Sequence, residues 1–288
     1  MTVCASMKRA DLRLLVCPKC RSGLEFRGEL LFDELATGTL RCEKSAHEWP
    51  FDDELAKLME DEAIHGLEGF MRCLYDTFAV LHDQLTRVVV PLMQFETESA
   101  TRDAYMRRID LTNIATRRRR GPLRVLEIGV GTGANLSLIE RDLPRGLDVE
   151  IWGLDFSRGM LEQCRRRPPL ASGRRVRLLL ADAHALPFPD STFDRVFHVG
   201  GIASFRDPRL ALAEMARVAR PETPIVVVDE RLDPERRHCL YHRLMFRALT
   251  FYDPAPTSPR AFLPKDAQNV IDEQASRFFY CLTFSVPR

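Results

Sequence analysis

The sequence predicts an α/β protein in which residues 121–288 form a doubly wound, mostly parallel sheet. From Leu123 onward, apolar runs of strand length alternate regularly with amphipathic stretches of helix length. This alternation is typical of a parallel sheet with helices on both faces. The first apolar run, at 125–128, ends in a loop with glycine at 129, 131 and 133, and a helix start follows. Strand, tight turn and helix therefore follow directly on one another.

The later elements are predicted from the same two signals. Apolar runs indicate further strands at 149–156, 176–183, 193–199, 224–229 and 278–286. Helix starts are expected after the capping residue Ser157, at the Asp-Pro pair 207–208 and at the Asp-Pro pair 233–234, with the last helix ending near residue 249. Between 254 and 277 no strand can be assigned securely.

Residues 1–59 are predicted to form a small zinc-ribbon-like unit. The Cys17-Pro18-Lys19-Cys20 segment puts two thiolates on one turn, which suits tetrahedral zinc. Cys42 and His47 are the available third and fourth ligands, and short strands are expected around 24–26 and 40–42. One alternative is a ribbon that has lost its metal and folds on its apolar contacts alone. A redox role for the two cysteines is less well supported, because no βαβ pattern surrounds them.

Residues 60–120 are predicted to form a helical cover or linker. Phe70, Leu74, Phe78 and Leu81 follow helical spacing, which we interpret as a face packed in the core, although Tyr75 and its neighbours could instead line a substrate pocket. The four arginines at 117–120 are interpreted as a solvated helix end rather than a phosphate-binding patch.

The bulk composition predicts a soluble globular protein. The chain has 288 residues, of which 45% are hydrophobic and 29% charged, and its formal net charge is +1. No global field therefore draws it to nucleic acid or anionic membrane, although local clusters could still do so. No apolar run approaches the ~20 residues of a spanning helix, and charged residues interrupt the first sixteen positions. Eight cysteines without secretory features indicate reduced thiols or metal ligands, so we expect a cytoplasmic protein.

Three acidic residues follow the strand pattern of the predicted sheet. Glu127 lies on the first strand, Asp155 ends the second, 26 positions after Gly129, and Asp182 ends the third. Ligands of such sheets bind across the carboxyl ends of the strands. Asp155 is suited to accept hydrogen bonds from ribose hydroxyls, and Asp182 from an adenine amino group. A dehydrogenase would also have an acid at position 155, so the glycine loop alone leaves the nucleotide-type ligand open.

The combination of motifs resembles class I S-adenosylmethionine-dependent methyltransferases, in the branch of ubiquinone/menaquinone-biosynthesis enzymes. The resemblance rests on GVGTG after a glutamate, LDFS, ADAHALPFPDSTFD and AEMARVARP, and it spans about 123–230. It implies a Rossmann-like sheet of seven strands, the last antiparallel, and S-adenosylmethionine as the cofactor. The cofactor-binding residues implied are Glu127, Gly129, Gly131, Gly133, Asp155, Phe156, Met160, Asp182, Ala183, His198 and Gly200. The N-terminal unit resembles the zinc ribbon of some rRNA guanine methyltransferases and the small subunit that activates several tRNA and protein methyltransferases.

Three functions are consistent with these residues. The first is methylation of a small molecule on O, N, S or C, with residues 60–120 and 231–265 covering the pocket. The second is rRNA or tRNA methylation, with the ribbon holding RNA, which the near-zero net charge disfavours. The third is a non-catalytic regulatory scaffold, which the presence of both Asp155 and Asp182 disfavours. His198 is the candidate general base, with a structural role favoured over it. Asp229 and Glu230 are expected either to meet the substrate or to cap the following turn.

Overall fold

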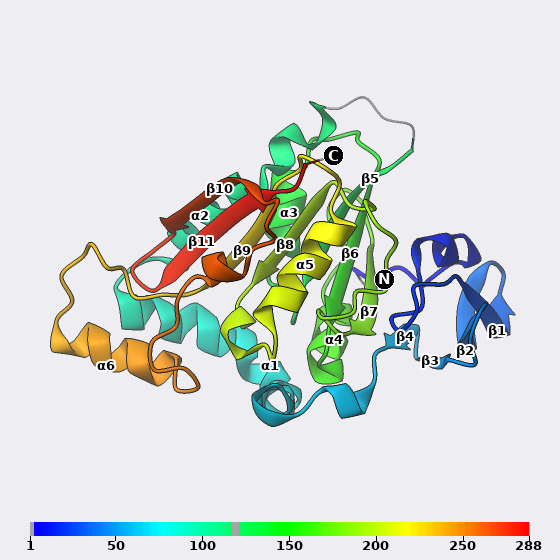
Figure 1. The fold of residues 1–288 in the computed structure, drawn as a ribbon, viewed down its shortest axis with the longest axis horizontal. Helices are drawn as coiled ribbons and strands as arrows, with labels where there is room; N and C mark the ends of the chain where they lie inside the picture. The colour runs from blue at the N-terminus through cyan, green and yellow to red at the C-terminus, as the bar shows by residue number, and fades with distance from the viewer. Residues whose placement is uncertain (1–2, 117–120, 288) are drawn as a thin grey trace.

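The computed structural model describes residues 3–116 and 121–287, which are built around one mixed sheet (Figure 1). The described residues contribute eleven strands in the order β1-β2-β3-β4-β7-β6-β5-β8-β9-β11-β10. The strands are β1 Leu24–Leu31, β2 Glu34–Cys42, β3 Glu48–Asp52, β4 Leu55–Leu58, β5 Leu123–Ile128, β6 Val149–Asp155, β7 Val176–Ala181, β8 Arg195–Val199, β9 Ile225–Glu230, β10 Gln268–Gln274 and β11 Phe279–Ser285. The α-helices are α1 Gly66–Gln94, α2 Glu98–Ile109, α3 Leu136–Asp142, α4 Arg158–Arg165, α5 Pro208–Val218 and α6 Leu240–Leu249.

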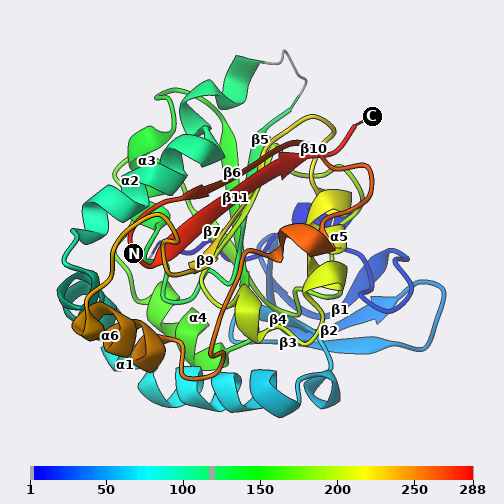
Figure 2. The same ribbon diagram turned by 60° about the vertical axis from the view of Figure 1, so that its left-hand side comes forward.

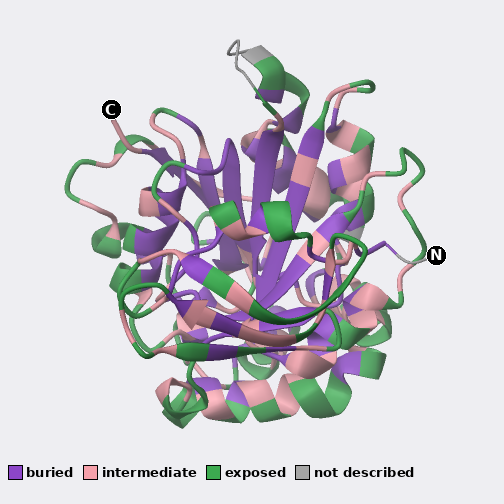
Figure 3. Ribbon diagram, turned by 90° about the vertical axis from the view of Figure 1, so that its right-hand side faces the viewer, coloured by how far each residue is buried: buried purple, intermediate pink, exposed green. Residues whose placement is uncertain are grey.

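The α/β prediction is confirmed in the centre of this sheet. Strands β7, β6, β5, β8 and β9 run parallel, and β11 is antiparallel to both β9 and β10. Every residue of β5 is buried, because a parallel strand has helices above and below it. Figure 3 shows that the central strands are mostly buried, whereas the outer strand β1 is mostly exposed. The strand that could not be assigned between 254 and 277 is β10.

The N-terminal strands extend the sheet. β4 pairs in parallel with β7, from Ala56 opposite Leu179 to Leu58 opposite Ala181. Trp49 and Phe51 share one apolar cluster with Trp152, which lies on β6. The sheet is therefore larger than the seven strands implied by the resemblance, because the four strands of the predicted ribbon add to its edge. The division of the chain at 59 and 120 stays a prediction.

Two of the three predicted helix starts are confirmed by their caps. The Ser157 hydroxyl accepts a hydrogen bond from the Met160 amide (3.2 Å), and Asp207 Oδ1 accepts one from the Leu210 amide (3.1 Å). The start predicted at 233–234 is wrong. Asp233 Oδ1 accepts from the amide two residues later (3.0 Å), which closes a turn, and α6 begins only at Leu240.

The helical segment differs from its prediction in orientation. α1 extends over 29 residues, but Phe70, Phe78 and Leu81, expected in the core, are 54%, 46% and 50% exposed. Figure 2 shows α1 along the lower edge of the molecule, below the ends of the strands and next to α6. No helix of the described residues is long and apolar enough to cross a membrane. The arginines at 117–120 lie outside the described residues.

Candidate active site

A cavity of about 410 Å³ lies at the carboxyl ends of the parallel strands, under α1. Ten of the eleven predicted cofactor residues line it: Glu127, Gly129, Gly131, Asp155, Phe156, Met160, Asp182, Ala183, His198 and Gly200. Gly133 is not among the lining residues. A Cβ atom there would lie 2.7 Å from Cys164 Sγ, so this glycine allows close packing instead.

The glycine loop has the left-handed backbone that its sequence predicts. Gly129 and Gly131 have φ of +68° and +54°, a region that non-glycine residues enter only with strain. A Cβ at Gly131 would meet nothing within 4 Å, so the space beside this turn is open. The Gly131 amide donates a hydrogen bond to Asp155 Oδ2 (2.9 Å). This hydrogen bond holds the glycine loop against Asp155 at the end of β6.

Asp155 and Glu127 are both buried at strand ends and both resist ionisation. Burial raises the pKa of Asp155 to about 6, although the amides of Gly131 and Ser157 donate to it. Burial also raises the pKa of Glu127 to about 8, and the Asn135 amide donates to its Oε1 (2.6 Å). Glu127 Oε2 has no hydrogen-bond partner among the described residues. A cationic or hydroxyl-bearing ligand would stabilise the charged form of both acids.

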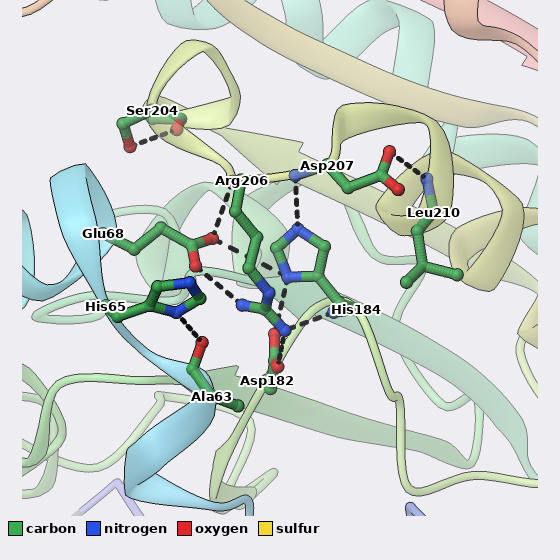
Figure 4. A network of polar contacts seen from close by, with 10 residues as sticks. Ala63, His65, Glu68, Asp182, His184, Ser204, Arg206, Asp207 and Leu210 are labelled. Atoms are coloured by element: carbon green, nitrogen blue, oxygen red, sulfur yellow. Dashed lines mark hydrogen bonds and ion pairs between the residues drawn. The ribbon is translucent and has the colours of Figure 1, made fainter.

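Asp182 lies in an ion-pair network that the sequence reasoning missed (Figure 4). Arg206 donates to Asp182 and, through Nη1, to Glu68 Oε2 (2.6 Å) on α1. His184 Nδ1 donates to Asp182 Oδ1 (2.7 Å), and His184 Nε2 accepts from the Asp207 amide (3.3 Å). Burial works against ionisation, but these donors lower the pKa of Asp182 to about 2. No local motif around 68 or 206 indicates this pairing, which joins segments 138 positions apart.

Three acidic side chains hold α1 above the cavity. Besides Glu68, Asp76 Oδ1 accepts from the Ser157 hydroxyl (2.6 Å) and from the amide at 159 (2.9 Å). Asp83 accepts from Thr132 of the glycine-loop segment and from Arg167 after α4. The side of α1 that carries these acids, and that also buries Met71 and Ala79, is therefore turned toward the sheet loops, while the side with Phe70 and Leu81 is exposed.

His198, Glu230 and Tyr75 add further hydrogen-bonding groups to the cavity lining, and the His198 ring lies directly beside Gly129. His198 Nδ1 donates to the Ile128 carbonyl (2.8 Å), so the neutral ring has its lone pair on Nε2, which has no partner among the described residues. Burial lowers the pKa of His198. Burial and the neighbouring Asp229 raise the pKa of Glu230, which accepts a hydrogen bond from the Tyr252 hydroxyl (2.8 Å). Burial also raises the pKa of Tyr75, which lines the same cavity.

Asp229 and Glu230 have different positions relative to this cavity. Asp229 is fully buried and accepts from the amides of Gly201 (2.9 Å) and Ala203 (2.8 Å), so it anchors the turn after β8. Glu230 lines the cavity. Asp229 therefore holds the turn after β8 and not the turn that follows β9, where a cap is expected, and of the two acids Glu230 is the one that lines the cavity.

The four predicted metal ligands are brought together at the far edge of the molecule. The ligand atoms of Cys17, Cys20, Cys42 and His47 all lie within 4.8 Å of one another. Cys17 Sγ is 3.3 Å from His47 Nδ1, and Cys20 Sγ is 3.3 Å from Cys42 Sγ. Three thiols and one imidazole at these separations match the donor set and the size of a tetrahedral zinc site.

Comparison with known proteins identifies the family. The sequence profile of a family described as a methyltransferase domain matches residues 125–222. The demethylmenaquinone methyltransferase of Thermus thermophilus is 39% identical over 133 residues, which cover 46% of this chain and 59% of the relative. That of Clavibacter sepedonicus is 31% identical over 171 residues, covering 57% of this chain and 67% of the relative. The malonyl-[acyl-carrier protein] O-methyltransferase of Halorhodospira halophila is 37% identical over 118 residues, covering 41% of this chain and 37% of the relative.

The chain thus spans less than two thirds of the length of the Thermus and Halorhodospira relatives. The names of these relatives favour neither RNA methylation nor a non-catalytic scaffold. Together with the parallel sheet and the glycine loop, the matches show that the chain belongs to the class I S-adenosylmethionine-dependent methyltransferases, in the branch of the ubiquinone- and menaquinone-biosynthesis enzymes.

Proposed function

We propose that this protein transfers the methyl group of S-adenosylmethionine to a small molecule bound in the cavity under α1. The observation that carries the proposal is that one cavity is lined both by the acids at three strand ends and by the polar wall of His198, Tyr75 and Glu230. The first set suits a cofactor that contains ribose, adenine and an amino acid. The second leaves hydrogen-bonding groups for an acceptor.

The residues present fit this cofactor. Gly131 leaves open space beside the loop, and Asp155 keeps lone pairs free to accept from ribose hydroxyls. The unpartnered Glu127 Oε2 suits the amino group of the methionine part. Asp182 suits the adenine amino group, in competition with Arg206. When bound, the cofactor supplies a methyl group on a sulfonium, which is already activated for in-line displacement.

The contribution of the chain is then alignment and exclusion of water. α1, held by its three acids, covers the cavity, and the end of α6 with the segment after it supplies Leu249, Phe251 and Tyr252 to the lining. This arrangement fixes an acceptor near the cofactor and keeps bulk water out. We assign to His198 the role of hydrogen-bond acceptor toward the hydroxyl or amine of the substrate, because its neutral ring has an unpartnered Nε2 lone pair.

The acceptor itself is left at the level of a small molecule. The relatives are named for different acceptors, demethylmenaquinone and malonyl-[acyl-carrier protein], so their names point to no single substrate. The lining combines apolar side chains such as Val90, Leu249 and Phe251 with a few polar groups, among them His198 and Glu230. Such a lining suits a largely apolar acceptor with one or two hydrogen-bonding groups.

We further propose that Cys17, Cys20, Cys42 and His47 hold one structural zinc ion. The proposal is supported by the closeness of the four ligand atoms, within 4.8 Å. Their strands continue into β4 and hence into the edge of the main sheet, so the metal would stabilise that edge.

The cofactor proposal is tested by calorimetry. S-adenosylmethionine is expected to bind the wild type, and Asp155→Ala is expected to weaken binding by about tenfold to a hundredfold, the worth of hydrogen bonds to a charged group. Asp103→Ala, at an exposed ion pair on α2, is the matched control and should leave affinity unchanged. Binding of NADH in place of S-adenosylmethionine would overturn the proposal. Labelled cofactor incubated with cell extract would then identify the methylated product.

A further inference from the structure

The outward face of α1 is apolar over most of its length. Six large apolar residues recur along it at helical spacing and are exposed: Leu67, Phe70, Leu81, Leu85, Val88 and Leu92. We call this set the α1 stripe. Exposed side chains that are scattered singly need no explanation, but a contiguous exposed strip of this kind usually marks an interaction site. The opposite side of α1 contacts the sheet loops through its acids, so the helix is fixed with the α1 stripe facing outward.

Helix α6 continues this surface. Figures 1 and 2 both show α6 beside α1 at the same edge of the molecule. The Tyr241 hydroxyl donates to the Leu92 carbonyl (3.0 Å), and the rings of Phe251 and Phe70 are in edge contact at 6.3 Å. α6 buries Phe246 and exposes Leu240, which is 71% exposed, together with Leu244. The exposed apolar surface therefore spans two helices.

The charges on α6 itself have one sign. The helix contains Arg243 and Arg247 and no acid, whereas Arg236 before it is paired with Glu96 and Asp233. Arg243 and Arg247 lie on the exposed side of α6 and have no ion-pair partner among the residues that the structure describes. The acids of α1 are turned to the opposite side, where Asp76 and Asp83 are hydrogen-bonded to the sheet loops. The surface thus combines large apolar side chains with unpaired cations.

We propose that the α1 stripe and the exposed face of α6 dock on the surface of an anionic lipid bilayer. Helices that lie in the membrane interface have this composition, with Leu and Phe entering the headgroup region and Arg contacting lipid phosphates. Since no described helix can cross a membrane, the contact is with one leaflet. A symmetric contact between two copies of this chain would instead bring the arginines of both α6 helices together, which like-charge repulsion opposes.

The cavity lies next to this surface. Val90 of α1 and Leu249 and Phe251 at the end of α6 line it. Docking would therefore bring an acceptor dissolved in the bilayer close to the cavity, a consequence that rests on the proposed methyl transfer. The docking itself does not rest on it.

The test is co-sedimentation of the full chain, without cofactor, with vesicles of phosphatidylcholine alone or mixed with phosphatidylglycerol. We expect binding to the anionic vesicles that weakens with added salt. Arg243→Gln combined with Arg247→Gln should weaken it about 25-fold, or about fivefold per arginine. Leu85→Ser combined with Val88→Ser should weaken it about tenfold. Leu31→Ser, an equally exposed leucine at the end of β1, is the matched control and should bind like the wild type.

Three outcomes would overturn the proposal. The first is a wild-type protein that sediments with neither vesicle. The second is that the double variants bind as well as the wild type. The third is a dimer in analytical ultracentrifugation that the stripe substitutions dissociate while vesicle binding is absent, in which case a second copy covers the surface. Circular dichroism of each variant checks that it is folded. Because no cofactor is present, failure here leaves the calorimetric test of S-adenosylmethionine binding untouched, and the reverse also holds.

Discussion

Glu127 links the stability of the ligand-free protein to pH. Its side chain is almost fully buried at the end of β5, and burial raises its pKa from 4.5 to about 8. Glu127→Gln keeps the shape of the side chain and an oxygen to accept from the Asn135 amide, but it cannot ionise. The substitution therefore isolates the free-energy cost of a buried negative charge.

The direction of the effect follows from proton linkage. The folded protein holds the Glu127 proton more tightly than the unfolded chain, so stability declines as pH rises between the unfolded and folded pKa values. For pKa values of 4.5 and about 8, the free energy of unfolding should fall by about 3 kcal/mol between pH 5 and pH 7.5 on account of this residue. The glutamine variant escapes that loss.

Urea unfolding of the wild type and of the glutamine variant at both pH values measures this change in the free energy of unfolding. The variant should gain about 3 kcal/mol relative to the wild type on going from pH 5 to pH 7.5. Glu25→Gln, on an exposed position of β1, controls for the removal of one carboxylate. If the difference between variant and wild type stays constant or shrinks as pH rises, Glu127 is ionised in the folded protein and the desolvation argument is refuted.

Three further outcomes are expected. Cys42→Ser should reduce zinc from about one equivalent per chain to near zero in elemental analysis, whereas Cys73→Ser on the exposed side of α1 should retain it. Arg206→Met removes the guanidinium between Asp182 and Glu68 and leaves Asp182 only its hydrogen bonds from His184, so it should cost about 2 kcal/mol in urea unfolding, discounted because the arginine is partly exposed; an unchanged midpoint would contradict the ion-pair arrangement. Since burial raises the pKa of Asp155 to about 6, calorimetric affinity for S-adenosylmethionine should fall about tenfold from pH 7 to pH 5; a constant affinity would mean that the carboxylate is not the ribose acceptor.

Local patterns predicted most of the residues that line the cavity at the strand ends. The glycine loop, Asp155 and Asp182 follow strands whose apolar runs are unmistakable, and parallel strands bring their carboxyl ends to one edge. The partners of these residues could not be predicted in the same way. Glu68 and Arg206 meet across 138 positions, and neither belongs to a pattern with a fixed spacing.

The helical segment shows why periodicity can mislead. The spacing of Phe70 and Leu81 correctly indicates a helix with an apolar face, but spacing does not say which face meets the protein. In α1, three acids contact the sheet loops and turn the apolar face outward. The start of α6 is predicted at 233–234, but Asp233 closes a turn there instead. An aspartate accepts from nearby amides in turns as readily as in helix caps.

The sequence by itself determined the alternation of strands and helices, the glycine turn and the acids at three strand ends. These depend on backbone sterics and on hydrogen bonds between neighbouring residues, which adjacent positions encode. Only the tertiary structure decided that β4 joins β7 at the sheet edge, that Glu68 and Arg206 pair across 138 positions, and that α1 exposes its apolar face. Those outcomes depend on which distant surfaces are available to pair, and a helix buries whichever face finds partners.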